Sequence, residues 1–156
     1  MRTLLFAIVT AVLLPASVKQ VRSSSDDPSR FTYVRIYCSD DKETHLQEVT
    51  VELAKGDFAP PAAPMYIGGK VPASSTLFVG ADPHWGAHDL AKHLNHPAPA
   101  AQFAIFLRGT WSVTTTDGET RRFRPGDVVR AEDTSPCKGH ITVNVGGKPG
   151  FMLFAP

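Results

Sequence analysis

The sequence predicts an all-β protein built as an antiparallel barrel or as two stacked sheets. Short β-branched and aromatic runs alternate with turn residues, and 13 Pro and 12 Gly among the 156 residues separate these runs. The chain is long enough for one domain with its own core and too short for two. Short strands with frequent turns favour a barrel or a double sheet, because closure removes exposed strand edges.

The composition indicates a globular protein and argues against a nucleic-acid partner. Hydrophobic residues make up 42% of the chain and charged residues 20%, which excludes wholesale disorder. The formal net charge is only +1. Nucleic-acid binding usually needs a clear basic excess, because release of counterions from phosphates drives it. We therefore expect no nucleic-acid partner.

Residues 1–17 have the layout of a secretory signal peptide. Arg2 provides a cationic start, an apolar run extends over Leu4–Leu14, and the small residues Ala16 and Ser17 follow Pro15. The run is about half of the roughly 20 residues that span a bilayer. A buried N-terminal helix or an uncleaved membrane anchor is the alternative. The prediction is a secreted protein that has no membrane attachment after cleavage.

The next part of the chain is expected to lead into a single domain. Residues 18–30 are small and polar, which predicts a flexible lead-in, and residues 31–156 are expected to form the domain. Strands are predicted over Phe31–Cys38 and Val49–Leu53. The prolines of Asp57–Pro64 exclude an interior strand, so we expect this segment to lie as an extended arm over the surface or mouth of the barrel.

Strand signals are denser in the second half of the chain. One short helix is predicted near residues 86–95, within the sequence HWGAHDLAKHLN. Asp117-Gly118 is a hairpin signal, because a type I′ turn needs positive φ at both positions. Strands are predicted over Thr76–Val79, Gln102–Leu107, Thr110–Thr116, Thr120–Phe123, Asp127–Ala131, His140–Val145 and Gly150–Phe154.

The chain has two cysteines, Cys38 and Cys137. Two cysteines do not make a disulfide framework, and nothing in the sequence fixes the distance between them, so their pairing stays open. A nucleophilic role for Cys137 is the alternative, with Lys138 and His140 as neighbours that would lower its pKa.

The strand that begins at Gln102 is predicted to line a cavity. Successive side chains of a strand point to opposite faces, so Gln102, Ala104 and Phe106 share one face. A buried amide without a partner costs about 1–3 kcal/mol, so Gln102 is expected to hydrogen-bond or to ligate. We predict Gln102, Phe106 and Trp111 as substrate-binding residues.

Histidines gather upstream of this strand. Four of the six lie between positions 84 and 96, namely His84, His88, His93 and His96. Three interpretations stay open. They form a solvated helix face; His84 and His88, at a spacing of four on one helix face, bind a metal of their own; or His93 joins the site that includes His96.

The segment Asn95–Phe154 resembles the cupin superfamily, in particular its small single-domain members. The first motif of that family is written G-x5-H-x-H-x3-4-E-x6-G. Gln102 stands at the place of the motif's Glu, seven residues before Gly109. His96 stands at the place of the first His, and Ala98 at the place of the second.

The second cupin motif, G-x5-P-x-G-x2-H-x3-N, is retained at its ends. Gly126, His140 and Asn144 match it, and the spacing of His140 and Asn144 is intact. Glu132-Asp133-Thr134 replace the motif's Pro-x-Gly. These paired carboxylates either cap a turn or repel each other, which would raise one pKa toward catalytic use.

The resemblance implies a jelly-roll β-barrel, often a homodimer, with a divalent transition metal inside. In this family three His and one Glu hold the metal. Here His96, Gln102 and His140 are the implied ligands, with His93 as a further one. Neutral imidazole suits Fe, Mn, Ni, Cu or Zn, but a Gln carbonyl is a weak neutral donor. A metal-free site is the alternative.

The resemblance implies a small-molecule enzyme. The family's activities suggest an isomerase or lyase, or a metal-dependent dioxygenase, that tailors a secondary metabolite such as a polyketide. His140 and His96 are the predicted catalytic residues, because imidazole titrates near neutral pH and suits acid–base catalysis. The alternative is a secreted, non-catalytic binding protein for a small apolar or sugar-like ligand.

Overall fold

The computed structural model describes residues 19–20, 26–87 and 95–156. These residues are all-β and contain no helix, which confirms the all-β part of the predicted fold. None of the described segments forms a helix that could cross a membrane. The expected signal peptide lies outside the described residues. So do residues 88–94 of the predicted helix, and residues 83–87 form turns.

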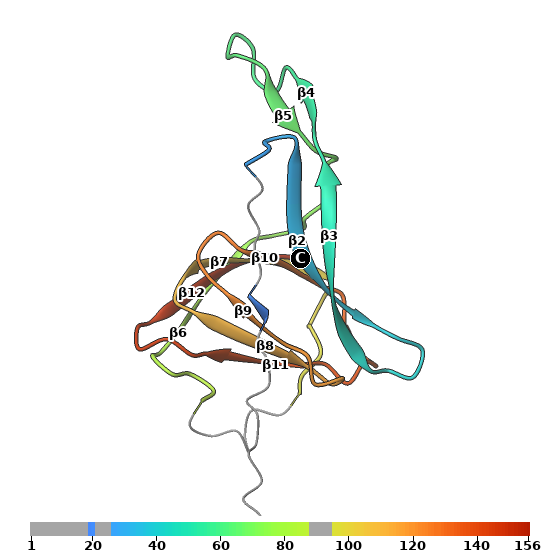
Figure 1. The fold of residues 1–156 in the computed structure, drawn as a ribbon, viewed down its shortest axis with the longest axis vertical. Helices are drawn as coiled ribbons and strands as arrows, with labels where there is room; N and C mark the ends of the chain where they lie inside the picture. The colour runs from blue at the N-terminus through green and yellow to red at the C-terminus, as the bar shows by residue number, and fades with distance from the viewer. Residues whose placement is uncertain (1–18, 21–25, 88–94) are drawn as a thin grey trace, which may run out of the picture.

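The described strands form two main sheets and a separate hairpin (Figure 1). The smaller sheet has the order β1 (Lys19–Gln20), β9 (Thr120–Phe123), β8 (Trp111–Thr115) and β11 (His140–Asn144). The larger sheet has the order β3 (Thr44–Glu52), β2 (Arg30–Cys38), β10 (Val128–Ala131), β7 (Gln102–Arg108), β12 (Gly150–Ala155) and β6 (Leu77–Ala81). The hairpin consists of β4 (Ala54–Gly56) and β5 (Met65–Ile67).

Most neighbouring strands are antiparallel, as the turn-rich sequence predicted. The two exceptions are β10 with β2 and β1 with β9, which pair in parallel. The second exception lies inside the expected flexible lead-in, where Lys19 and Gln20 pair with Arg121 and Arg122. A two-residue ladder is too short for sequence periodicity to reveal it.

The two sheets enclose one core of aromatic and aliphatic side chains. Phe106 of the larger sheet stacks on Phe123 of the smaller one, with ring centroids 5.0 Å apart. Trp111 is completely buried beside Phe106 and donates its indole N–H to the carbonyl oxygen of Arg108 at 3.0 Å. Together these rings join the sheets at one end of the space between them.

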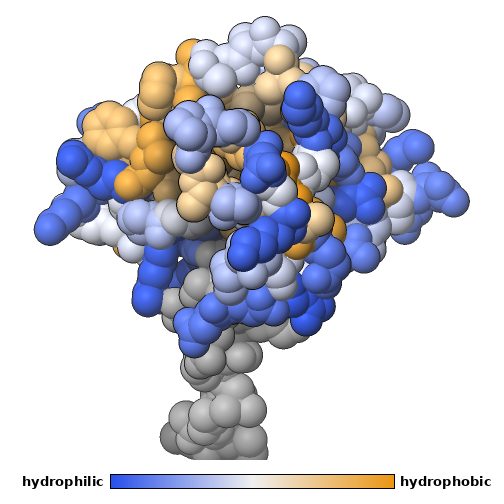
Figure 2. Space-filling model, turned by 90° about the horizontal axis from the view of Figure 1, so that it is seen from above, coloured by the Kyte–Doolittle hydropathy of each residue, from blue (hydrophilic) through white to orange (hydrophobic). Residues whose placement is uncertain are grey.

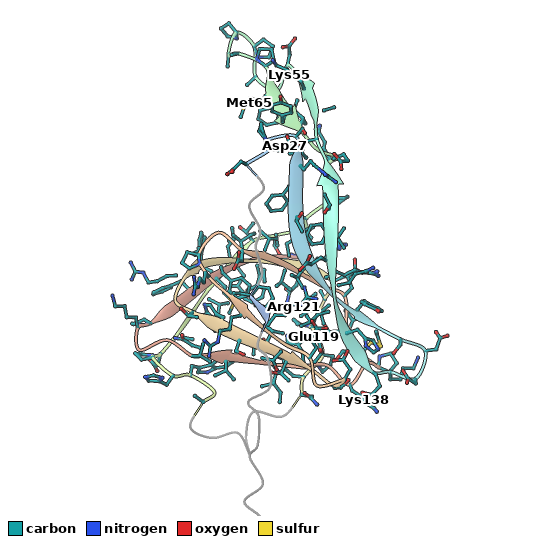
Figure 3. The ribbon with its side chains drawn as sticks, in the orientation of Figure 1. Asp27, Lys55, Met65, Glu119, Arg121 and Lys138 are labelled. Carbon is teal, nitrogen blue, oxygen red and sulfur yellow. A yellow bond between two sulfur atoms is a disulfide. The ribbon has the colours of Figure 1, made fainter. Side chains whose placement is uncertain are left out.

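The hairpin projects away from the two sheets, beyond the ends of β2 and β3 (Figure 1). Lys55 and Met65 lie on it, far from Arg121 and Lys138 on the body of the protein (Figure 3). The segment 57–64 joins its two strands, so the predicted arm over the mouth of a barrel is wrong. In the view from the hairpin end, hydrophobic residues gather mainly toward the upper left, and hydrophilic residues predominate along the lower and right edges (Figure 2). Phe58 and Met65 are among the exposed apolar residues.

A disulfide joins Cys38, the last residue of β2, to Cys137 in the loop before β11. The Cα atoms are 6.0 Å apart, and the bond closes a loop between residues 99 positions apart in the sequence. The question left open by the sequence is therefore answered, and the alternative of a nucleophilic Cys137 is wrong. The bond ties the larger sheet to the loop that leads into His140.

Removal of this disulfide is expected to lower the stability of the fold. A cross-link over about 100 residues reduces the conformational entropy of the unfolded chain, so a Cys38→Ala/Cys137→Ala variant should lose about 2–5 kcal/mol of unfolding free energy. Urea unfolding followed by circular dichroism measures the loss. A reductant should affect the wild type in the same way and leave the double variant unchanged. Equal unfolding midpoints for the oxidised and reduced wild type would contradict this expectation.

Candidate functional site

A cavity of about 290 Å³ lies between the two sheets. Strand β7 contributes Gln102, Ala104 and Phe106 to its wall, as the alternation along this strand predicted. Strand β11 contributes His140 and Thr142 from the opposite sheet. The cavity lies at the lower end of the size range of small-molecule sites, so its ligand must be small.

The polar groups of the cavity gather at one end. Apart from His96, Gln102, His140 and Thr142, the described lining residues are aliphatic or aromatic. Gln102 and His140 are the first residues of their strands. Gln102 pairs with Ala131 across the sheet, and Ala131 lies two residues before Asp133, which hydrogen-bonds to His140. At the other end, Phe106 lies opposite Met152. A ligand would therefore meet a polar end and an apolar end.

His140 is held by a buried carboxyl group. Its Nδ1 lies 2.7 Å from Oδ2 of Asp133, and the Asp133 side chain is completely buried. With the proton of a neutral imidazole on Nδ1, that N–H donates to Asp133 and Nε2 is left as an acceptor. Because Nδ1 is engaged by Asp133 and His140 lines the cavity, Nε2 is the ring nitrogen left for a ligand. Oδ1 of Asp133 has no hydrogen-bond partner among the described residues.

His96 lies directly beside His140. The backbone N–H of each residue donates to the carbonyl oxygen of the other, at 3.0 Å in both directions. The ring centroids are 4.9 Å apart. His96 is more exposed than His140 and also lines the cavity. The structure thus brings together the two predicted catalytic residues.

The paired carboxylates point in opposite directions. Asp133 faces the interior, whereas Glu132 forms ion pairs with Arg35 and Arg130. Partial burial raises the pKa of Glu132, but hydrogen bonds from Arg130 and Arg35 outweigh it and hold that pKa below its usual value. Sequence reasoning weighed both carboxylates but did not assign Asp133 to His140. The two residues are seven positions apart and lie on no regular element together.

The remaining predicted site residues are only partly at the cavity. Phe106 lines it, but Trp111 is packed behind Phe106 and is not among the described residues that line it. His84 is an exposed turn residue, and His88 and His93 lie outside the described residues. Within the described part of the chain, no group of three or more His, Cys, Asp or Glu side chains could hold a metal ion.

The loop between Asp133 and His140 is clamped against the β2–β3 turn. The hydroxyl of Thr44, which is completely buried, donates to the carbonyl oxygen of Gly139 at 2.6 Å. The backbone N–H of Lys138 donates to the carbonyl oxygen of Lys42 at 3.0 Å, and the Cys137 disulfide adds a covalent tie. These contacts determine where His140 enters its strand.

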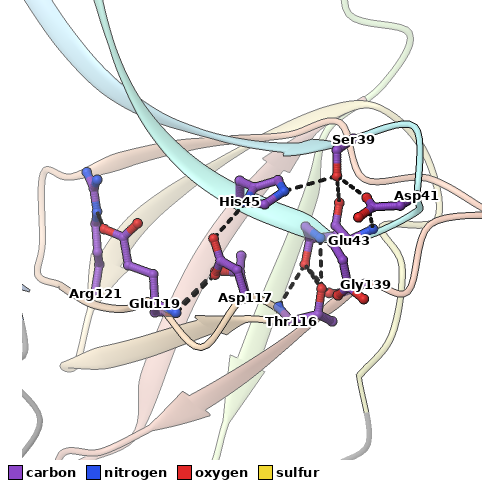
Figure 4. A network of polar contacts seen from close by, with 11 residues as sticks. Ser39, Asp41, Glu43, His45, Thr116, Asp117, Glu119, Arg121 and Gly139 are labelled. Atoms are coloured by element: carbon purple, nitrogen blue, oxygen red, sulfur yellow. Dashed lines mark hydrogen bonds and ion pairs between the residues drawn. The ribbon is translucent and has the colours of Figure 1, made fainter.

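A second His–Asp pair lies on the surface near this clamp (Figure 4). His45 Nδ1 is 2.7 Å from Oδ2 of Asp117, and His45 Nε2 is 3.0 Å from the hydroxyl of Ser39. The contacts from Ser39 to His45 and from His45 to Asp117 resemble a serine-hydrolase triad. However, the Ser39 hydroxyl also donates to Asp41 at 2.6 Å. The Ser39 hydroxyl has a single proton, which it donates to Asp41 and not to His45. The negative charge of Asp41 would also oppose negative charge that develops at Ser39 when its hydroxyl is deprotonated. The group therefore ties two turns together.

Asp117 and Asp41 of this surface cluster both have lowered pKa values. For Asp117, burial raises the pKa, but hydrogen bonds from the Glu119 backbone, Thr115 and His45 outweigh it. For Asp41, the hydrogen bond from Ser39 is the largest cause, followed by the backbone N–H of Glu43. The folded structure therefore stabilises the ionised form of each carboxyl group, and ionisation of these groups stabilises the fold.

No protein-family model matches the chain, and no curated protein matches it. The function is therefore inferred from the residues of the site itself.

The approach of Gly139 to His96 predicts a position that tolerates no side chain. An added Cβ would lie 2.1 Å from the carbonyl carbon of His96, and φ of Gly139 is +82°. Gly126 is a matched control, because its φ is +95° and nothing lies within 4 Å of its added Cβ. Gly126→Ala should cost about 1–2 kcal/mol of stability from backbone strain alone. Gly139→Ala should cost clearly more in urea unfolding, and equal losses would contradict the clash.

The surface cluster predicts a change in acid stability. Because the pKa of Asp117 is lower in the folded state than its ordinary 3.8, its contribution to stability is complete above that value. The contribution is lost as the pH falls through the lowered pKa. Asp117→Asn should therefore be less stable than wild type at pH 6, and the difference should shrink by pH 2. Urea unfolding against pH measures this, with the exposed Asp26→Asn as control. A difference that does not change with pH would refute it.

Proposed function

We propose that the cavity is the active site of a small-molecule enzyme of the isomerase or lyase type, and that His140 moves a proton in it. The observation that carries the proposal is the hydrogen bond between buried Asp133 and His140 at the wall of an otherwise mainly apolar cavity. Burial of a carboxyl group costs free energy, and here the only side-chain partner that offsets this cost among the described residues is His140. His140 in turn lines the cavity.

The arrangement is suited to general acid–base catalysis. Asp133 orients the imidazole, holds the proton on Nδ1 and would stabilise the imidazolium that forms when Nε2 accepts a proton. His96 is a second imidazole on the same wall, from which a proton can be returned at another position of the substrate. A double-bond isomerisation or a dehydration needs only these transfers, with no oxidant.

The resemblance to small cupins belongs to the same proposal. Two sheets around a cavity, with His96, Gln102 and His140 together on its wall, support a jelly-roll arrangement of this kind. A metal-dependent dioxygenase would have to bind its metal with the imidazoles of His96 and His140 and the amide of Gln102. None of the described lining residues adds a carboxylate to this set of donors. Because this set fits a metal poorly, the proposed steps use only protein groups.

A binding protein without catalysis is the second candidate function. The apolar end of the cavity favours it, because burial of an apolar ligand there needs no chemistry. A sugar-like ligand is the less suitable form of this alternative, because its many hydroxyl groups would face aliphatic walls. An apolar ligand with one polar group fits both candidate functions, so binding alone does not distinguish them.

Secretion and dimerisation remain proposals. The disulfide between Cys38 and Cys137 supports export, because such bonds persist mainly in oxidising compartments. Dimerisation rests only on the resemblance to cupins.

Turnover that depends on His140 is the central prediction of the proposed function. Small apolar compounds that bind the protein in ligand-observed NMR should be incubated with it and analysed for products by mass spectrometry and NMR. His140→Gln should keep binding and lose about 100-fold or more of the rate, and Asp133→Asn should lose rate through the wrong tautomer. Circular dichroism checks that each variant is folded.

His45→Gln is the matched control, because His45 also pairs with an aspartate but lies away from the cavity lining. It should leave turnover unchanged. Compounds that bind wild type and His140→Gln alike and are converted by neither would favour the binding protein. Conversion that requires an added divalent metal ion and survives His140→Gln would also overturn the proposed mechanism.

A further inference from the structure

The polar end of the cavity also constrains the chemical class of the ligand, an argument that rests on the proposed function. None of the described lining residues is a Lys, Arg, Asp or Glu. The carboxyl group of Asp133 is hydrogen-bonded to His140 and does not itself line the cavity. A permanently anionic ligand would lose its hydration without meeting a permanent cation, and a buried charge without a partner is costly. These features favour an uncharged ligand.

Gln102 indicates which polar group this ligand carries. The residue as a whole is 9% exposed and lines the cavity, and no described residue hydrogen-bonds to its amide. The amide atoms are not sealed off, so water or a ligand in the cavity can pair with them, and a ligand that displaces this water must replace its hydrogen bond. The amide N–H can donate to a carbonyl oxygen. The ligand's polar group would then lie between Gln102 and the His140 ring.

We infer that the substrate is a small, uncharged carbonyl compound with an acidic α C–H, whose carbonyl oxygen accepts a hydrogen bond from Gln102. The α C–H bond breaks, and its proton moves to Nε2 of His140. The electron pair of that bond forms a C=C bond, and the π electrons of the carbonyl group move to oxygen. Gln102 donates to the enolate oxygen that results. Return of the proton, to the same carbon or to a conjugated one, completes the isomerisation without a co-reactant.

Three probes with related carbon skeletons test the class of ligand. The first is 2-tetralone, an uncharged ketone; the second is tetralin, which lacks the carbonyl group; the third is 1,2,3,4-tetrahydro-2-naphthoate, a carboxylate. NMR titration of the full chain should show the tightest binding for the ketone. Tetralin should bind about tenfold more weakly, the effect of one lost hydrogen bond. The carboxylate should bind more weakly than the ketone. Equal or tighter binding of the carboxylate would overturn the inference.

Variants of Gln102 test the role of its amide. Gln102→Leu should remove the preference for 2-tetralone over tetralin, and Gln102→Glu, which replaces the donor with a carboxylate, should weaken the ketone further. Gln47→Leu is the matched control, because Gln47 is exposed on β3. An unchanged preference in Gln102→Leu would overturn the role assigned to Gln102.

Loss of α-proton signal from 2-tetralone in buffered D₂O reports proton transfer separately from binding. The wild type should accelerate the exchange, and His140→Gln should not. Ketone binding that depends on Gln102, without accelerated exchange, would support the ligand class and contradict the proposed catalysis. Turnover of carboxylates that depends on His140 would support the catalysis and contradict the ligand class.

Discussion

The candidate site depends on the short backbone bridge between His96 and His140. Two hydrogen bonds of 3.0 Å join a segment without regular structure to the first residue of β11. The bridge requires a glycine at position 139, because any side chain there would overlap the backbone of His96. It brings both imidazoles to one wall of the cavity between the sheets. A further backbone hydrogen bond, from Ala98 to the carbonyl oxygen of Asp133 at 3.2 Å, holds the same segment two residues later.

The contacts around this bridge form a rigid support. The hydroxyl of Thr44 holds Gly139 from one side, and the disulfide from Cys38 holds Cys137 two residues earlier. Both partners belong to the β2–β3 hairpin, which pairs with the rest of the larger sheet through β10. The loop that carries Asp133 at its start and His140 at its end is thus attached to the sheet that also provides Gln102. Precise placement of catalytic groups requires support of this kind.

Part of this arrangement could be predicted from local patterns. The strand alternation put Gln102, Ala104 and Phe106 on one face, and all three line the cavity. The same alternation does not show which aromatic residue lies behind another, so Trp111 was predicted as a lining residue although it packs behind Phe106. Asp133 was considered, but its pairing with His140 follows from the path of an irregular loop, for which no periodicity exists.

The sequence alone determined the all-β class, most of the strands and the turns between them, because periodicity and turn chemistry are local properties. It also singled out His96, Gln102 and His140. Only the tertiary structure decided that Cys38 pairs with Cys137, that Asp133 supports His140, and that the proline-containing segment 57–64 joins a projecting hairpin. These features depend on contacts between residues that no local pattern relates, and the packing of the two sheets brings such residues together.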